Sequence, residues 1–153
     1  MVLIRQYDPT VDYPALRACF VELQTWEQSL EPDLPAPEEA ADPYLAEVFR
    51  NCAENSGRVF LAEADGVVVG FICVLAKVPP SADDGIAPYG YISDLIVRAA
   101  HRRRGIGREL MIVCARMRGH AAQGRRVGAQ RSYPCLLSRW WFPRLHSAAG
   151  QAA

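Results

Sequence analysis

Hydrophobic residues recur in the first third of the chain at the spacing of an α-helix. Leu16, Phe20 and Leu23 share one face of a first predicted helix. A second helix is predicted over residues 38–54, and its buried stripe is expected to comprise Tyr44, Leu45, Val48, Phe49 and Cys52. Residues 31–37 separate the two helices as a loop, because the prolines clustered there prevent regular structure.

Runs of β-branched and aromatic residues predict four strands. The first covers residues 2–7, and the fourth covers residues 89–97. Between them, residues 58–63 and 67–75 flank an Asp-Gly dipeptide at 65–66. This dipeptide predicts a hairpin, because glycine tolerates the positive φ that the turn requires.

Glycines mark two further features of the chain. Gly70 lies inside the second hairpin strand, where the missing side chain indicates a bulge or a close backbone neighbour. Gly105 and Gly107 open a last helix, which is expected to stop near Gly119 or Gly124. The order of elements is therefore strand, two helices, hairpin, strand, glycine turn and helix.

The length of 153 residues suits one domain with its own core, and no internal repeat is visible. We expect residues 1–124 to form the core of this domain and residues 125–153 to form a divergent C-terminal segment of it. No apolar run reaches the roughly 18 residues that span a bilayer, and the N-terminus lacks a signal pattern. A cytoplasmic protein without a membrane partner is therefore expected.

The cysteines argue against a metal site. Their number is odd and no CxxC spacing occurs, so we interpret them as reduced, small apolar residues. They are Cys19, Cys52, Cys73, Cys114 and Cys135. No metal ligand set is predicted.

Charge divides the chain into two parts. Residues 1–97 hold 16 Asp and Glu against 5 Lys and Arg, whereas residues 98–153 hold 12 Arg against 1 Glu. The arginines concentrate in residues 101–110, HRRRGIGREL, between an apolar strand and an apolar helix. Such crowding of positive charge at a flexible turn indicates an anionic ligand.

A glycine turn that leads into a helix is a suitable place for phosphate oxygens. The first N–H groups of a helix lack intrahelical partners, and the helix dipole adds positive charge there. Glycines allow close backbone approach, and flanking arginines add charge-assisted hydrogen bonds. The segment is neither a GxxxxGK[ST] phosphate loop nor a GxGxxG dinucleotide fingerprint.

The order of elements, together with Arg102-Arg-Arg-Gly105-Ile-Gly107 in the pattern [RQ]xxGx[GA], resembles the GNAT acetyltransferase superfamily. The resemblance covers residues 2–124 and is strongest over residues 58–118. It implies an α/β fold with a mixed, mostly antiparallel central sheet and helices on both faces. It also implies acetyl-CoA as co-substrate and transfer of its acetyl group to a primary amine by direct attack.

The same resemblance assigns a binding site. The arginine–glycine turn (residues 102–107) would hold the pyrophosphate of acetyl-CoA, and the pantetheine arm would pair with main-chain groups of the fourth strand. An N–H group of Ile96 or Val97 would also stabilise the tetrahedral oxyanion. The binding residues so implied are Leu95, Ile96, Val97, Arg102, Arg103, Arg104, Gly105, Ile106, Gly107 and Arg108.

Asp94 is the one carboxylate in an otherwise apolar strand. A buried carboxylate is costly unless it is paired. One interpretation is a base that takes the proton from the substrate ammonium. The other is a strand-edge Asp that accepts hydrogen bonds from the backbone or from an arginine.

The C-terminal part departs from the family pattern. The family's usual Asn, then Tyr, then Gly-Phe are not recognisable after residue 120, and Tyr133 is the one candidate for the acid that protonates the CoA thiolate. A frame shift near residue 120 and a divergent tail both remain open. Trp140, Trp141 and Phe142 either bury against the core or mediate a homodimer.

The acceptor is expected to be a small-molecule or peptide amine. The first two predicted helices and the loop between them are acidic and include Trp26, a combination that favours a cationic amine. A solvated surface with Trp26 partly buried is the other interpretation. These acidic residues are Glu22, Glu27, Glu31, Asp33, Glu38, Glu39 and Asp42. The alternative is a catalytically impaired acyl-CoA-binding or regulatory module. No nucleic acid is expected as a partner, because lysine is nearly absent and the aromatic residues form no stacking platform.

Overall fold

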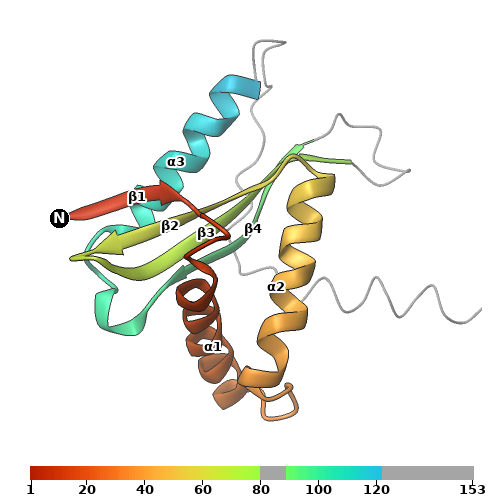
Figure 1. Cartoon of the computed structure of the whole chain (residues 1–153), viewed down its shortest axis with the longest axis vertical. Coiled ribbons are helices and arrows are strands. Elements are labelled where there is room, and N and C mark those ends of the chain that lie inside the picture. The colour runs from red at the N-terminus through yellow and green to blue at the C-terminus, as the bar shows by residue number, and fades with distance from the viewer. Residues whose placement is uncertain (80–88, 122–153) are drawn as a thin grey trace, which may run out of the picture.

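The computed structural model describes residues 1–79 and 89–121, and within the last helix the side chains up to residue 115. Its centre is a four-stranded antiparallel sheet in the order β1-β2-β3-β4 (Figure 1). The strands are β1 (Val2–Gln6), β2 (Arg58–Ala64), β3 (Val67–Val78) and β4 (Tyr89–Val97). The residues Tyr133, Cys135, Trp140, Trp141 and Phe142, singled out from the sequence, lie outside the described residues.

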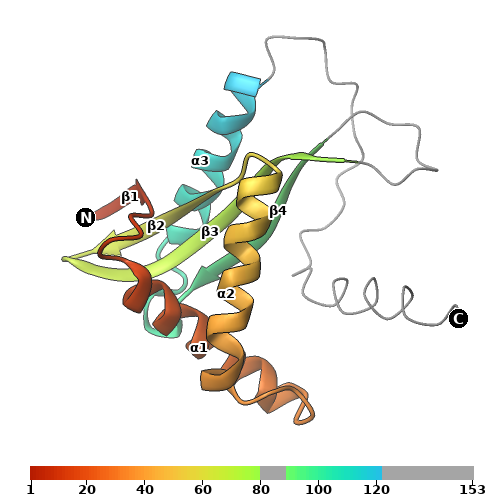
Figure 2. The same ribbon diagram turned by 45° about the vertical axis from the view of Figure 1, so that its right-hand side comes forward.

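Helices cover both faces of the sheet. Figures 1 and 2 show α1 (Tyr13–Leu30) and α2 (Pro37–Glu54) side by side on one face and α3 (Ile106–Ala121) on the other. Each face has its own cluster of buried side chains, one under α1 and α2 and one under α3. The expected α/β class, with a mostly antiparallel sheet between helices, is confirmed for the described residues.

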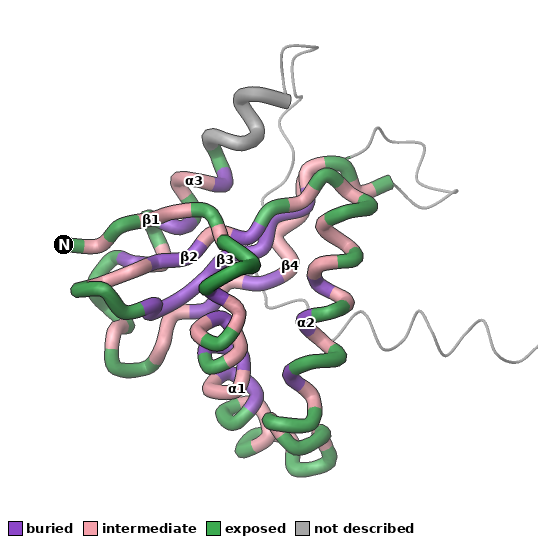
Figure 3. The backbone as a smooth tube through the Cα atoms, viewed as in Figure 1, coloured by how far each residue is buried: buried purple, intermediate pink, exposed green. Residues whose placement is uncertain are grey.

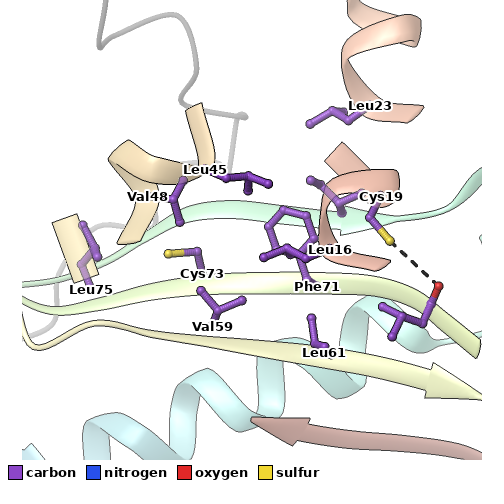
Figure 4. Close-up of a cluster of buried hydrophobic side chains, with 12 residues drawn as sticks. Leu16, Cys19, Leu23, Leu45, Val48, Val59, Leu61, Phe71, Cys73 and Leu75 are labelled. Atoms are coloured by element: carbon purple, nitrogen blue, oxygen red, sulfur yellow. Dashed lines mark hydrogen bonds between the residues drawn. The ribbon is translucent and has the colours of Figure 1, made fainter. Parts of the chain in front are cut away.

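β3 is buried along most of its length because it is covered on both faces (Figure 3). On one face, Phe71 and Cys73 pack under Leu16 of α1 and under Leu45 and Val48 of α2 (Figure 4). The predicted helical stripes are confirmed at these positions. Three other members of the second stripe, Tyr44, Phe49 and Cys52, are only partly buried.

The hairpin forms where Asp-Gly predicts it. Asp65 has φ 51° and Gly66 has φ 77°, so both turn residues adopt the left-handed backbone of a tight hairpin. Gly70 shows the close approach that its position indicates, since an added Cβ would collide with the carbonyl of Ile96 and lie 3.2 Å from the Cα of Val97. A bulge also lies beside it, where the register between β2 and β3 shifts.

A second bulge shapes β4. Val74 pairs with Ile92 and Cys73 pairs with Asp94, so Ser93 is an extra residue in β4. After this bulge, Ile96 packs in the cluster under α1 and α2, whereas Leu95 and Val97 pack in the cluster under α3. By strand alternation, Asp94 shares the α1 and α2 face with Ile96.

Neither a membrane-spanning helix nor a metal-binding group of side chains occurs in the described part of the chain. None of its helices has the length and apolar character needed to cross a membrane. Its residues also include no group of three or more His, Cys, Asp or Glu side chains that could hold a metal ion.

Candidate functional site

The arginine–glycine turn follows β4 by way of a short 3-10 helix, η1 (Ala99–His101). Arg103 has φ 62° and Gly105 has φ 81°, so two left-handed residues bend the chain into α3. Nothing lies within 4 Å of the place where a Cβ of Gly105 would be, so its positive φ, and not crowding, requires glycine. Ile106, the first residue of α3, is 2% exposed and anchors the turn to the core.

The turn presents unpaired main-chain N–H groups. Within the described residues, no main-chain carbonyl accepts a hydrogen bond from the N–H groups of residues 103–108. The pairing begins again at Glu109, whose N–H donates to the carbonyl of Gly105 at 3.1 Å. Because the helix dipole places positive charge at the same end, these donors form a suitable cradle for an anion.

The arginines of the turn differ in their surroundings. Arg102 donates from Nε to the carbonyl of Val97 at 2.9 Å, so its guanidinium lies against the end of β4. Arg103, Arg104 and Arg108 are exposed and form no ion pair with a described carboxylate. They are therefore available to add charge-assisted hydrogen bonds to a bound diphosphate.

Glu22 of α1 fastens the chain just before this turn. Its carboxylate accepts hydrogen bonds from Arg98 Nε at 2.8 Å and from the N–H of Ala99 at 2.6 Å. Burial opposes ionisation of Glu22, but these donors outweigh it and hold the pKa of Glu22 below its ordinary value. Sequence analysis grouped Glu22 with the acceptor surface, whereas the structure places it under the turn.

β4 is an edge strand within the described residues, so one side of its backbone is open. The N–H of Arg98 donates to Val69 at 2.9 Å, which fixes the alternation of the ladder. By that alternation Ile96 bonds to β3, whereas Leu95 and Val97 direct their main-chain groups to the open edge. Of the three strand residues assigned by resemblance, Leu95 and Val97 thus have the required orientation and Ile96 does not.

Asp94 lies on the opposite side of β4 from α3 and is 6% exposed. Its Oδ1 accepts a hydrogen bond from the hydroxyl of Tyr44 on α2 at 2.6 Å. The ring of Tyr44 stacks on Phe20 of α1, with centroids 4.6 Å apart and planes 18° apart. The carboxylate is therefore held by α2 as well as by its own strand, a contact that sequence analysis did not predict.

The acidic surface of α1 and α2 is smaller than its sequence suggests. Glu38 and Asp42 form ion pairs with Arg17, and Asp42 also accepts a hydrogen bond from Tyr13 at 2.5 Å. Arg17 therefore neutralises part of this surface. Trp26 is 44% exposed, as a side chain that contacts a ligand must be.

Comparisons with known proteins agree with this arrangement. A sequence model of the acetyltransferase (GNAT) family matches residues 22–132. A search of curated proteins found no match. Many solved structures are similar in fold. One is from Pyrococcus horikoshii OT3, with 21% identity over 78% of this chain and 73% of that chain and a TM-score of 0.63.

Two of the similar structures contain a form of coenzyme A. The PaiA N-acetyltransferase from Thermoplasma acidophilum, in complex with coenzyme A, is 16% identical over 79% of this chain and 74% of its own, with a TM-score of 0.58. AAC(6')-Iy, in complex with the bisubstrate analog CoA-S-monomethyl-acetylneamine, is 22% identical over 100% of this chain and 92% of its own, with a TM-score of 0.56. Because the family model spans more than half of the sequence, the chain belongs to the acetyltransferase (GNAT) family.

Proposed function

We propose that this protein is an N-acetyltransferase that moves an acetyl group from acetyl-CoA to a primary amine by direct attack. The observation that carries the proposal is the row of unpaired N–H groups at residues 103–108, next to the open edge of β4. A diphosphate and an extended amide-bearing arm require these two features side by side. The N–H groups suit the diphosphate, and the strand edge suits the arm.

The open edge also supplies an oxyanion donor. The N–H of Val97 is directed to this edge, and Arg102 occupies the Val97 carbonyl and leaves that N–H available. A main-chain N–H aimed at the thioester oxygen would polarise the carbonyl and stabilise the negative charge that develops on it. We assign this role to Val97, because the main-chain groups of Ile96 are directed to β3.

Asp94 is the proposed base. It takes a proton from the substrate ammonium, and the neutral amine then attacks the thioester carbon. A C–N bond forms, the tetrahedral oxyanion collapses, and the C–S bond breaks to release the CoA thiolate. The former amine nitrogen loses its extra proton to give the neutral amide, and the thiolate takes up one proton to give the CoA thiol. Tyr133, the candidate acid for that last step, lies outside the described residues and stays a prediction.

The acceptor is proposed to be a cationic small-molecule or peptide amine. Glu31, Asp33 and Glu39 form no ion pair with a described residue, and Trp26 is exposed near them in the chain. Negative charge with an aromatic face favours a cation. The complex of AAC(6')-Iy with the bisubstrate analog CoA-S-monomethyl-acetylneamine, in a similar fold, is compatible with this proposal.

The test combines binding with transfer. Titration calorimetry with coenzyme A is expected to show binding that Gly105→Glu abolishes, and labelled acetyl-CoA is expected to acetylate at least one member of a panel of polyamines, aminoglycosides and peptides. Absence of coenzyme A binding contradicts the whole proposal. Tight binding without transfer to any amine supports the alternative, a catalytically impaired acyl-CoA-binding or regulatory module.

A further inference from the structure

The hydrogen bond between Tyr44 and Asp94 lies on the face of the sheet covered by α1 and α2, and the reaction proposed above assigns it no role. The two residues are 50 positions apart, and the hydroxyl donates to the carboxylate at 2.6 Å. A hydrogen bond to a carboxylate is short and strong when the acceptor is ionised. The contact therefore joins α2 directly to the strand that carries the proposed base.

The ring of Tyr44 is held in place by its neighbours. Phe20 stacks on it at 4.6 Å and is itself completely buried. Leu45 and Val48, which follow Tyr44 on α2, are buried against β3 and fix the helix. Because the ring has little freedom, its hydroxyl oxygen has a defined position with respect to Asp94.

Asp94 needs such a partner on physical grounds. Its exposed fraction of 6% means that water solvates it poorly, and a poorly solvated carboxylate favours the neutral form unless donors stabilise its charge. The bulge at Ser93 sets its backbone, and Cys73 lies opposite it in register. Tyr44 supplies a hydroxyl donor from the side of α2.

We infer that Tyr44 is a positioning residue for the proposed base: its hydroxyl keeps the Asp94 carboxylate ionised and directed toward the acceptor amine. This inference rests on the proposed function. The thiols of Cys52 on α2 and Cys73 on β3 also face Asp94. Of these three groups, the Tyr44 hydroxyl donates a hydrogen bond to the carboxylate at 2.6 Å.

The first experiment compares Tyr44→Phe with a matched control. Phe keeps the ring and its stacking but removes the hydroxyl, so kcat is expected to fall about tenfold or more while KM for acetyl-CoA changes less than about twofold. The acid limb of the pH–rate profile is expected to move to higher pH, because the ionised carboxylate has lost a donor. Tyr13→Phe removes a similar hydrogen bond, to Asp42, and is expected to leave kcat and the profile unchanged.

Asp94→Asn, alone and combined with Tyr44→Phe, separates this inference from the proposed function. If the pair acts as a unit, the double variant is expected to be no slower than Asp94→Asn. A harmless Asp94→Asn contradicts the proposed base itself. A strong loss in Asp94→Asn with normal kcat and pH profile in Tyr44→Phe overturns the role of Tyr44 alone.

A further variant covers the case in which Tyr44→Phe does not fold. Phe20→Leu removes the stacked ring and leaves both hydrogen-bonding partners in place. Looser positioning of the hydroxyl is expected to lower kcat and to shift the acid limb in the same direction, by less than Tyr44→Phe. Unchanged kcat and an unchanged acid limb in a folded Phe20→Leu protein, with normal coenzyme A affinity, contradict the inference.

Discussion

The thiols of Cys52 and Cys73 lie 3.5 Å apart, sulfur to sulfur, although one belongs to α2 and the other to β3. Cys73 is also the register partner of Asp94, so this thiol pair is next to the proposed base. Cys52 is the more exposed of the two. Its hydrogen bond with Cys73 lowers the pKa of Cys52, whereas the same contact and burial raise the pKa of Cys73.

We expect hydrogen peroxide to convert these two thiols into a disulfide. Cys52, the more easily ionised, is oxidised to a sulfenic acid by hydrogen peroxide, and Cys73 then displaces water to form the disulfide. The protein loses two hydrogen atoms, which intact mass spectrometry detects, and dithiothreitol restores them. Because the new bond ties α2 to β3 beside Asp94, acetyl transfer is expected to fall on oxidation.

Two comparisons make this result specific. Burial raises the pKa of Cys19 to about 11, so that thiol is expected to stay reduced. Cys52→Ser is expected to keep its activity in peroxide. A disulfide that maps to other cysteines, or the same loss of activity in Cys52→Ser, speaks against the pair as the oxidised site.

Glu22→Gln tests the fastening of the arginine–glycine turn. Gln keeps an oxygen acceptor for the Ala99 N–H but loses the ion pair with Arg98, a partly exposed pair worth about 1 kcal/mol. Dissociation constants for coenzyme A are expected to rise about fivefold, with kcat nearly unchanged, since 1.4 kcal/mol corresponds to tenfold. Calorimetry measures this change directly.

The matched control for Glu22 is Glu47→Gln. Glu47 pairs with Arg50 one turn further along α2, in an exposed ion pair away from the turn. It is expected to leave the affinity for coenzyme A unchanged. Equal effects of the two variants mean that net charge, not the position of Glu22, controls binding.

Gly105 and Gly107 are expected to respond differently to alanine. Gly105→Ala forces a Cβ onto a residue with φ 81°, so it costs about 1 kcal/mol and disturbs the N–H cradle. At Gly107 an added Cβ would lie 3.9 Å from Val97 Cγ2, an ordinary contact at the start of a helix. Coenzyme A binding is therefore expected to weaken in Gly105→Ala and to persist in Gly107→Ala, as calorimetry and thermal unfolding will show.

A charged side chain at residue 107 is expected to abolish the coenzyme A binding that alanine at this residue leaves intact. Gly107→Glu places a carboxylate among the N–H groups and arginines that would hold the diphosphate, and like charge is expected to abolish binding while the fold survives. Normal binding by Gly107→Glu means that the diphosphate lies elsewhere.

Sequence patterns predicted the parts of the fold that depend on neighbouring residues. The Asp65-Gly66 turn and the bend at Gly105 follow from backbone preferences at the residues themselves. The fourth strand has the bounds predicted for it, Tyr89–Val97, because its apolar run follows Pro88 and ends before the arginine-rich segment that begins at Arg98. Where the backbone preference of neighbouring residues determines the structure, a single sequence is sufficient to predict it.

The parts that sequence patterns could not predict depend on distant contacts. Tyr44 looked like one more apolar residue of a helical stripe, yet its hydroxyl donates to the carboxylate of Asp94 on β4. Glu22 looked like surface charge, yet it bonds to Ala99. The orientation of the Ile96 backbone depends on the bulge at Ser93 and on pairing with β3, which no local pattern specifies.

A last prediction concerns stability and pH. Arg5 of β1 donates to both carboxylate oxygens of Asp12, at 2.6 and 2.8 Å, and to Glu63 at 2.8 Å. Asp12 is 4% exposed and also accepts a hydrogen bond from the N–H of Asp8. The hydrogen bonds from Arg5, together with that N–H, outweigh burial and hold the pKa of Asp12 below its ordinary value.

The sign of the pH dependence follows from this lowered pKa. The unfolded carboxyl binds a proton at about pH 4, before the folded one does, so the contribution of Asp12 is complete above that pH and is lost as the pH falls further. Asp12→Asn is expected to lower the free energy of unfolding at pH 7 by about 2 kcal/mol and to reduce its dependence on pH in the acid range. Asp65→Asn, which alters a carboxylate that is 94% exposed, is expected to do neither. Urea unfolding followed by circular dichroism at pH 7 and pH 3 measures both quantities. A constant difference between wild type and Asp12→Asn at the two pH values contradicts the ion pair as its cause, because an effect of packing alone does not titrate.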